Sequence, residues 1–177
     1  MKDNKLILGI LSDNHGEHYP QIEENLIGCD AILHAGDVGK IEILKSLSSL
    51  GPPLYVATGN NDCGVLRKVS QEFKLVQFDS INLRVLMTHD PGSYNTLVLS
   101  DLPKLIQEKM DEFKPNLFVF GHWHKRFAKM VNGIYFFNPG GVTKKYTRDG
   151  KPGYSKLYVS KQPNNGQFSF EPEFFNL

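Results

Sequence analysis

The sequence predicts an α/β protein in which two β-sheets pack face to face and helices cover the outside of the sandwich. Over the first sixty residues, short apolar runs alternate with helical patterns, as they do in a parallel sheet with crossover helices. From residue 74 onward, apolar runs flank tight-turn signals, which indicates a second half that is mostly antiparallel. No linker, repeat or low-complexity segment interrupts the chain, so we expect residues 1–177 to form a single domain.

The first part of the chain predicts the order strand, helix, strand, helix, strand. Short apolar runs bounded by polar residues indicate buried strands at 5–13, 30–37 and 53–60. The helices between them span 19–28 and 40–51, and each ends at a glycine. Their apolar stripes consist of Ile22 and Leu26 in the first helix and of Ile41, Leu44, Leu47 and Leu50 in the second.

The second part of the chain predicts hairpins. Residues 74–90 indicate two strands around a tight turn near Asn82, and Asn132 with Gly133 marks a hairpin within residues 126–140. Further strands are expected at 116–122, 154–160 and 166–172.

One more helix is expected after residue 100. Ser100 and Asp101 can cap it, and Pro103 falls in its first turn. Its apolar face comprises Leu102, Leu105, Ile106, Met110 and Phe113. We expect this helix to lie outside the sandwich, like the first two.

Composition excludes several classes of protein. The formal net charge is +1, so the chain is not a polycation that coats nucleic acid or an anionic membrane. Its two cysteines, Cys29 and Cys63, are too few for a disulfide framework, which favours a reducing compartment. The N-terminal apolar run is too short for a membrane span and lacks a signal-peptide cleavage site. We therefore expect a cytoplasmic protein with no membrane association.

Polar residues with metal-binding side chains stand where the apolar runs stop. These residues are Asp13, His15, Asp37, Asn60, Asp62, His89, His122 and His124. In open α/β sheets, ligands collect at the carboxyl ends of the strands. The chain has 6 histidines and four of them belong to this set, which makes independent coincidence a poor explanation. Carboxylates, imidazoles and a carboxamide without a thiolate suit manganese, iron, nickel or zinc.

The number of candidate ligands predicts two ions rather than one. A single site uses roughly four to six ligands including water, whereas the set offers seven candidate ligands. Two ions that share a bridging carboxylate would use them all. We therefore expect two divalent ions, manganese first, and we expect His122 and His124 to serve different ions.

The same residues resemble the sequence pattern of calcineurin-like metallophosphoesterases, in particular the small single-domain phosphodiesterases. That pattern runs D-x-H, G-D, G-N-x-[DE], a lone His and G-H-x-H. The matching segments are Asp13-Asn14-His15, Gly36-Asp37, Gly59-Asn60-Asn61-Asp62, His89 and Gly121-His122-Trp123-His124. Asn138 to Gly141, with the sequence NPGG, resembles the NPGS turn of the small members. The resemblance implies a four-layer αββα fold, a β-sandwich flanked by helices.

The resemblance also implies a role for each matched residue. The first ion would be held by Asp13, His15 and His124, the second by Asn60, His89 and His122, with Asp37 as the bridge. Asn61 and Asp62 would orient these ligands without binding an ion. The resemblance implies hydrolysis of a small or nucleotide-derived phosphodiester, in which a hydroxide that bridges the two ions attacks phosphorus. The catalytic residues would be Asp37, Asn60 and His89.

Three positions depart from the family pattern. Asn61 stands where phosphomonoesterases carry the histidine that protonates the leaving group, and this change favours diester substrates. Asp90 follows His89 where glycine is usual, and it either adds charge near the second ion or caps the turn at Pro91. Gly141 replaces a serine, which removes one local hydrogen bond.

Several polar residues lie outside the pattern. His34 lies inside an apolar strand and is expected to be a core histidine, whereas His18 follows the first motif and could touch substrate. Basic residues at 125–126 and 144–148 either steer a phosphate-rich substrate or form a solvated face.

Two other functions compete with the enzyme hypothesis. The retromer complex contains a subunit that resembles this family but has lost part of the metal set, so the alternative is a non-catalytic scaffold. In the present sequence every ligand position holds a competent residue, which favours an enzyme. A nuclease is the third hypothesis, but the chain lacks an added DNA-binding domain, and we do not expect specific nucleic-acid binding. A homo-oligomer remains open.

Overall fold

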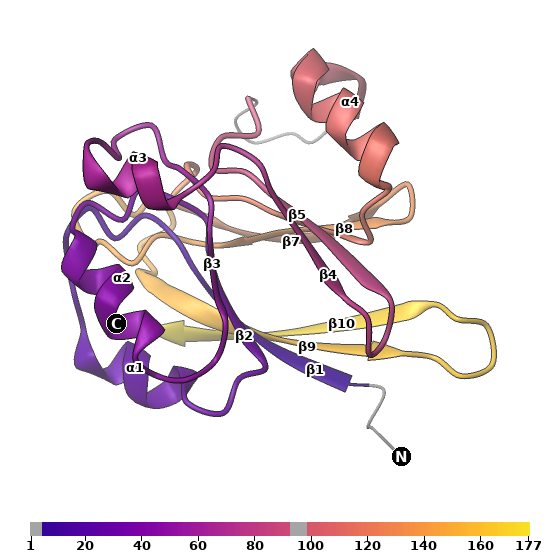
Figure 1. The fold of residues 1–177 in the computed structure, drawn as a ribbon, viewed down its shortest axis with the longest axis horizontal. Helices are drawn as coiled ribbons and strands as arrows, with labels where there is room; N and C mark the ends of the chain where they lie inside the picture. Colours follow the sequence, from indigo (N-terminus) through magenta and orange to yellow (C-terminus); the bar gives the residue numbers. More distant parts are fainter. Residues whose placement is uncertain (1–4, 93–98) are drawn as a thin grey trace.

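Two five-stranded sheets pack face to face in the computed structural model, which describes residues 5–92 and 99–177 (Figure 1). The strand orders are β10-β9-β1-β2-β3 in the first sheet and β4-β5-β6-β8-β7 in the second. Helices lie on the outer faces of both sheets. This arrangement confirms the predicted α/β sandwich with helices outside.

The first sheet combines the predicted parallel strands with the C-terminal hairpin. Its strands are β1 (Lys5–Leu11), β2 (Ala31–His34), β3 (Leu54–Val56), β9 (Gly153–Lys161) and β10 (Phe168–Asn176). β1, β2 and β3 are parallel, and Leu11 pairs with His34, which in turn pairs with Val56. The carboxyl ends of these three strands therefore meet at one edge. β9 runs antiparallel to both β1 and β10.

The second sheet is mixed. Its strands are β4 (Lys74–Phe78), β5 (Leu83–Met87), β6 (Leu117–Val119), β7 (Arg126–Val131) and β8 (Ile134–Pro139). β5, β6 and β8 run parallel to one another. β4 is the antiparallel hairpin partner of β5, and β7 is the antiparallel hairpin partner of β8. The predicted turns are present, since Asn82 and Asn132 adopt positive φ angles of 56° and 48°.

The helices form two outer layers. They are α1 (Pro20–Leu26), α2 (Ile41–Ser48), α3 (Val65–Val69) and α4 (Lys104–Phe113), with a 3₁₀ turn at Leu99–Asp101. α1, α2 and α3 pack on the first sheet, and α4 packs on the second. The sequence did not predict α3, because a five-residue helix that buries a single side chain, Leu66, leaves no apolar stripe to recognise.

The predicted start of α4 is wrong. The helix begins at Lys104 after Pro103, whose ψ of 139° is extended, and no side chain caps it. Ser100 and Asp101 lie in the preceding 3₁₀ turn, where the Ser100 hydroxyl donates to the Asp101 carboxylate at 3.0 Å. A proline disfavours helical geometry in the residue before it, so the helix does not extend back through Leu102. Leu105, assigned to the apolar face, is 47% exposed.

Three apolar clusters hold the four layers together. The central cluster lies between the sheets and includes Leu8, Val85 and Phe137, all fully buried. The two outer clusters join α1, α2 and α3 to the first sheet through residues such as Leu47, and α4 to the second sheet through residues such as Ile106. Each buried side chain of this size contributes about 1.5–3 kcal/mol.

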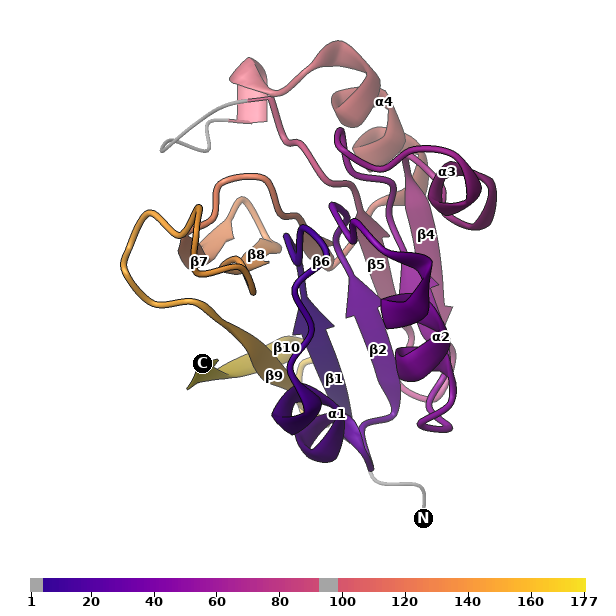
Figure 2. The ribbon, with the colours of Figure 1, turned by 90° about the vertical axis from the view of Figure 1, so that its left-hand side faces the viewer.

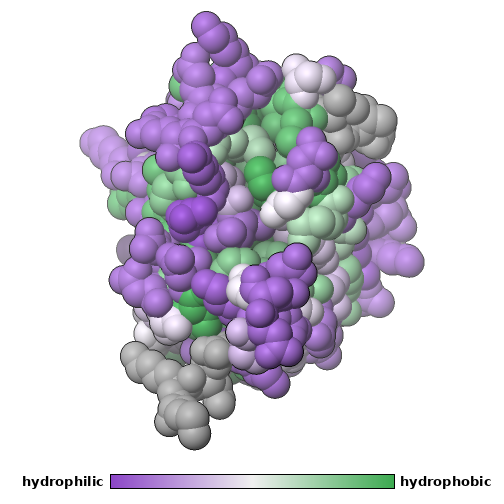
Figure 3. Space-filling model, turned by 90° about the vertical axis from the view of Figure 1, so that its right-hand side faces the viewer, coloured by the Kyte–Doolittle hydropathy of each residue, from purple (hydrophilic) through white to green (hydrophobic). Residues whose placement is uncertain are grey.

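One end of the sandwich carries the hairpin tips. Figure 3 looks onto this end, where green apolar surface lies in the middle of a purple polar rim. Met130, Phe168 and Phe170 line a cavity of about 410 Å³ between the β7–β8 and β9–β10 hairpins. Within residues 5–92 and 99–177, no helix is long and apolar enough to cross a bilayer.

Candidate metal centre

All seven predicted ligands come together at the opposite end of the sandwich. They lie in the loops that follow β1, β2, β3, β5 and β6, the parallel strands of both sheets (Figure 2). The carboxyl ends of parallel strands lie at the same edge of a sheet, and here the two edges face each other. Residues from Asp13 to His124, far apart in the sequence, thus become neighbours.

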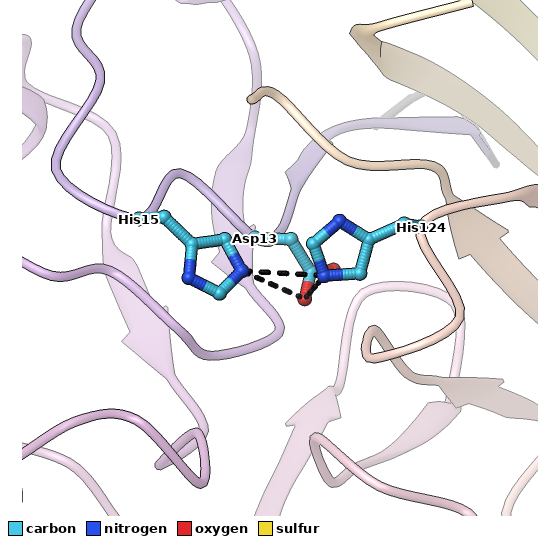
Figure 4. Close-up of side chains that lie close together, drawn as sticks. All are labelled: Asp13, His15 and His124. Atoms are coloured by element: carbon cyan, nitrogen blue, oxygen red, sulfur yellow. Dashed lines mark hydrogen bonds and ion pairs between the residues drawn. The ribbon is translucent and has the colours of Figure 1, made fainter. Parts of the chain in front are cut away.

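Asp13, His15 and His124 form the first group of converging ligand atoms (Figure 4). The Nε2 atoms of His15 and His124 lie 3.2 Å apart. The Asp13 Oδ1 atom lies 3.2 Å from His124 Nε2 and 4.0 Å from His15 Nε2. Three ligand atoms within this space are compatible with a single small cation.

Asp13, Asp37 and His89 form a second group, which shares Asp13 with the first. The His89 Nε2 atom lies 3.3 Å from Asp37 Oδ2 and 3.9 Å from Asp13 Oδ1. Asn60 joins this group through its carbonyl oxygen, which lies 3.0 Å from His89 Nε2 and 3.0 Å from His122 Nδ1.

Asp37, a member of the second group, also reaches the first group. Its Oδ2 atom is 3.6 Å from His15 Nε2, in the first group, and 3.3 Å from His89 Nε2, in the second. The sequence assigned the bridge to Asp37 alone, but Asp13 Oδ1 also faces both groups. Two carboxylates therefore reach both halves of the centre.

Neighbouring groups fix the orientation of both carboxylates. The Ser12 hydroxyl donates to Asp13 Oδ2 at 2.6 Å, and the His122 backbone N–H is shared between Oδ2 at 3.1 Å and Oδ1 at 3.2 Å. The Asn61 backbone N–H and side-chain amide donate to the two oxygens of Asp37 at 2.8 and 2.6 Å. Ser12 was not singled out from the sequence, because a serine that ends a strand carries no distinctive signal.

The Asp62 carboxylate connects the loop after β2 to the loop after β3. Its carboxylate accepts the backbone N–H groups of Asp37, Gly39 and Gly59 at 3.1, 3.2 and 2.9 Å. Asp62 is 1% exposed. Within residues 5–92 and 99–177, its carboxylate forms no hydrogen bond or ion pair with a histidine. The structure thus places Asp62 behind the ligands.

The backbone of the loops is strained at the ligands. Asp13, His15, Asp37, His122 and His124 all have φ between 46° and 64°, a region that non-glycine residues rarely occupy. Glycine is required beside them. A Cβ at Gly59 would lie 2.0 Å from the Asp37 backbone nitrogen, and one at Gly121 would lie 2.0 Å from Ser12 Oγ. Such close approach explains why glycine precedes Asn60 and His122.

The donor set fits divalent cations. His124 Nε2 and His15 Nε2 face each other at 3.2 Å beside the buried carboxylates of Asp13 and Asp37, a mixed nitrogen and oxygen donor set that divalent cations accept. The His89 Nδ1–H donates to the Ala35 carbonyl at 2.7 Å, which directs Nε2 toward the carboxylates, as is usual for a metal-binding histidine. The residues present therefore fit a divalent cation.

A family model described as the calcineurin-like phosphoesterase superfamily domain matches residues 6–162. The chain belongs to this superfamily. The resemblance seen in the motifs is thereby confirmed, and the family is metal-dependent.

Two curated relatives and one solved structure illustrate the relationship. A probable metallophosphoesterase of Mycoplasma genitalium is 27% identical over 153 residues, which cover 86% of each protein. A phosphodiesterase of Methanocaldococcus jannaschii is 24% identical over 147 residues, 75% of this chain and 82% of that protein. Wild-type Vps29 of Entamoeba histolytica, complexed with zinc, has a TM-score of 0.68 at 19% identity, covering 97% of this chain and 100% of that one. The structural likeness shows that the fold is shared.

The departures from the superfamily pattern have visible consequences. Asp90 caps the turn, because its Oδ1 accepts the Gly92 N–H at 2.7 Å, and its Oδ2 lies 3.6 Å from Nε2 of the predicted ligand His122. His124 Nδ1 is buried without a hydrogen-bond partner among the described residues, and a Cβ at Gly141 would lie 3.1 Å from it. Gly141 thus lies beside His124 Nδ1 but has no side chain that could bond to it.

Within the described part of the chain, the side chains of His34 and His18 form hydrogen bonds or an ion pair with residues other than the seven predicted ligands. His34 is fully buried, with Nε2–H donating to Asn14 Oδ1 at 3.0 Å and Nδ1 accepting the Gly36 N–H at 3.2 Å. Burial lowers the pKa of His34 to about 4, so it is a neutral core residue as expected. His18 lies 3.1 Å from the Glu23 carboxylate.

Tyr146 is a neighbour of the centre that the sequence did not reveal. Its ring lies edge-on to His15 and His124, with centroid separations of 5.0 and 5.9 Å. Glu17 holds the surrounding loop, since it accepts hydrogen bonds from the Tyr19 and Thr143 hydroxyls at 2.6 and 2.7 Å. The only available signal was the basic run around Tyr146, which fits a solvated face equally well.

Burial and charge set the protonation of the ligands in the metal-free protein. Burial alone lowers the pKa of His89, but its hydrogen bond to Asp37 and the charges of Asp13 and Asp37 outweigh this and raise the pKa to about 9. Burial raises the pKa of Asp37, but the contacts with His89 and Asn61 hold it well below its usual range. Burial also lowers the pKa of His15 and His122. In the metal-free protein at neutral pH, protonated His89 thus supplies the positive charge beside Asp13 and Asp37 that a bound cation would otherwise supply.

Metal binding at neutral pH is expected to release about one proton, from His89. The raised pKa means that His89 keeps this proton until the pH approaches about 9, so metal affinity should rise about tenfold per pH unit from about 6.5 to 9. A pH-indicator dye in weakly buffered solution measures the release. His18→Ala should leave it unchanged and His89→Ala should remove it, whereas equal release from both variants would contradict the assignment.

Proposed function

We propose that this protein is a phosphodiesterase that uses two divalent metal ions, manganese first, to hydrolyse a small or nucleotide-derived phosphodiester. One observation carries the proposal. The Oδ2 atom of Asp37 lies within reach of both groups of ligand atoms, 3.6 Å from His15 and 3.3 Å from His89. A carboxylate that faces two sets of histidines is suited to a pair of ions and has no such use in a single-ion site.

The bound ions would supply the chemistry that is common to two-metal hydrolytic sites. Two divalent ions in such a site lower the pKa of a water for in-line attack on phosphorus and neutralise the phosphoryl oxygens.

The protein contributes position and charge. Asp13 and Asp37 supply two negative charges that hold the cations, and Ser12 and Asn61 keep the carboxylates in place. Asp62 ties the loops after β2 and β3 together, so that Asp37 and Asn60 keep their spacing. These contacts preorganise the centre before substrate arrives.

Asn61 supports the choice of a diester substrate. Its side-chain amide donates to Asp37 Oδ2 and cannot give up a proton to a leaving group at neutral pH. The acidic alcohol of an aryl diester can leave without a proton donor, whereas the alcohol of an alkyl monoester needs one.

The test is a panel of phosphodiesters and phosphomonoesters assayed with chelator-stripped protein and each divalent metal added singly. We expect metal-dependent hydrolysis of aryl diesters and slower hydrolysis of alkyl monoesters. Hydrolysis that is unaffected by chelation, or a preference for alkyl monoesters, would contradict the proposal.

The scaffold hypothesis has one supporting observation, the fold shared with Vps29 over 97% of the chain. It predicts no turnover of any ester with any metal. The complete set of seven ligand-type residues favours the enzyme.

His122→Ala and His124→Ala should have different consequences for metal binding. Wild-type protein is expected to bind two manganese ions per chain, and each variant should keep one. His124 belongs to the group with Asp13 and His15, whereas His122 lies beside Asn60. Elemental analysis and titration of each variant give the count and the affinity. If both variants keep the same ion with the same affinity, the division of ligands between two ions is wrong.

A further inference from the structure

A cleft of about 590 Å³ opens beside the metal centre. Asn60 and His89 form part of its wall, so a molecule in the cleft would be next to these two predicted ligands. The volume falls within the roughly 300–1,000 Å³ that is typical of small-molecule sites. The cleft is therefore continuous with the place where the phosphoryl group of a substrate would lie.

Part of the cleft wall is apolar. Phe73, which precedes β4, lines it together with Leu105 and Ile106 of α4. Leu105 is 47% exposed although the periodicity of α4 assigned it to the core. Its position in the cleft wall accounts for this difference, because apolar surface that faces a cleft is available to a ligand.

The charges of the cleft do not favour a second phosphate. Among residues 5–92 and 99–177, the charged side chains in its wall besides His89 are Arg67, Glu72 and Asp90, one cation and two carboxylates. The Arg67 Nε–H donates to the Asp62 carbonyl at 2.8 Å, which holds the guanidinium in place. The basic residues at 125–126 and 144–148 do not line this cleft. An uncharged group with a flat apolar ring matches these surroundings better than a phosphorylated one.

We propose that this cleft receives one ester substituent of the phosphodiester and selects an uncharged, ring-bearing group, such as a nucleoside or an aryl group, over a phosphorylated one. The inference rests on the proposed phosphodiesterase function, which would place the scissile phosphate at the metal centre. The apolar wall of Phe73, Leu105 and Ile106 would contact the ring, and Glu72 and Asp90 would disfavour a second phosphate.

The first test measures binding to the metal-free protein, without turnover. Adenosine should bind in titrations followed by NMR, and ribose 5-phosphate should bind at least about fivefold more weakly. Leu105→Ser and Leu105→Glu should each weaken adenosine binding by about fivefold or more. The matched controls are Met130→Ser and Met130→Glu, because Met130 is 48% exposed and lines a cavity at the other end of the sandwich. Both controls should bind adenosine like wild type.

The second test compares two diesters with the same leaving group on manganese-loaded enzyme. Thymidine 5′-(p-nitrophenyl phosphate) and methyl p-nitrophenyl phosphate both carry a ring that can enter the cleft, so both Leu105 variants should raise the KM of each diester by about fivefold or more, and the Met130 variants should leave both KM values unchanged. KM values that neither Leu105 variant raises, or adenosine binding that neither Leu105 variant changes, would overturn the cleft assignment and leave the proposed function intact. Adenosine binding that depends on Leu105, in a protein that hydrolyses no diester, would uphold the cleft and overturn the function.

Discussion

Replacing Asp37 with alanine is expected to lower the turnover of an aryl phosphodiester by at least about 10³-fold, because metal charge stabilisation contributes several kcal/mol to such reactions. Asp37 Oδ2 is the atom that reaches both His15 and His89. Without it, neither group of ligands is complete, so both ions should bind more weakly. Manganese titrations and steady-state rates of the same preparation measure the two effects.

Asp79→Ala is the matched control for this variant. Asp79 is an exposed aspartate whose carboxylate accepts a hydrogen bond from the Gln77 side chain at 2.8 Å, and its carbonyl bond to the Asn82 N–H survives the substitution, so the variant should change neither metal content nor rate. Circular dichroism of both variants verifies the fold. If Asp37→Ala kept more than about a tenth of the wild-type rate under saturating metal, the assignment of the bridge would be wrong.

Asn61→His should raise the turnover of alkyl phosphomonoesters by about 10²-fold while changing aryl-diester turnover much less. A general acid typically contributes about 10²- to 10⁴-fold, and the gain applies only where the leaving group needs a proton. The backbone N–H of residue 61, which donates to Asp37 Oδ1 at 2.8 Å, is unaffected by the substitution. The measured quantity is the ratio of monoester to diester rate constants with one metal.

Asn61→Ala separates the two roles of this side chain. It removes the 2.6 Å hydrogen bond to Asp37 Oδ2 without supplying an acid, so diester turnover should fall modestly and monoester turnover should not rise. A wild type that already turns over alkyl monoesters faster than diesters would show that another residue donates the proton. The diesterase assignment would then have to be abandoned.

Local sequence determined the kinds of element and the chemistry of the site. The apolar runs that end at Asp13, Asp37 and His89 are strands, because alternation and run length act over a few residues. The ligand types are likewise local, since a carboxylate or an imidazole has the same donor atoms wherever it lies. The order of these residues matched the superfamily pattern without any structural knowledge, and the family model agrees.

Local signals failed where a neighbour far along the chain decides the outcome. Leu105 has the periodicity of a buried residue but lines a cleft, and α3 exists although it has no apolar stripe. The start of α4 was misplaced because the effect of Pro103 on the preceding residue outweighed the capping ability of Ser100 and Asp101.

The sequence by itself thus determined which strands form and which side chains can bind a metal. Only the tertiary structure decided that β9 pairs with β1, that Asp13 as well as Asp37 faces both ligand groups, and that Tyr146 packs against His15. It also decided the protonation of His89, whose pKa depends on two carboxylates from other loops. The physical reason is that distances of 3 to 4 Å between such loops are fixed by strand pairing and by the packing of the two sheets, which bring together residues that no short stretch of sequence relates.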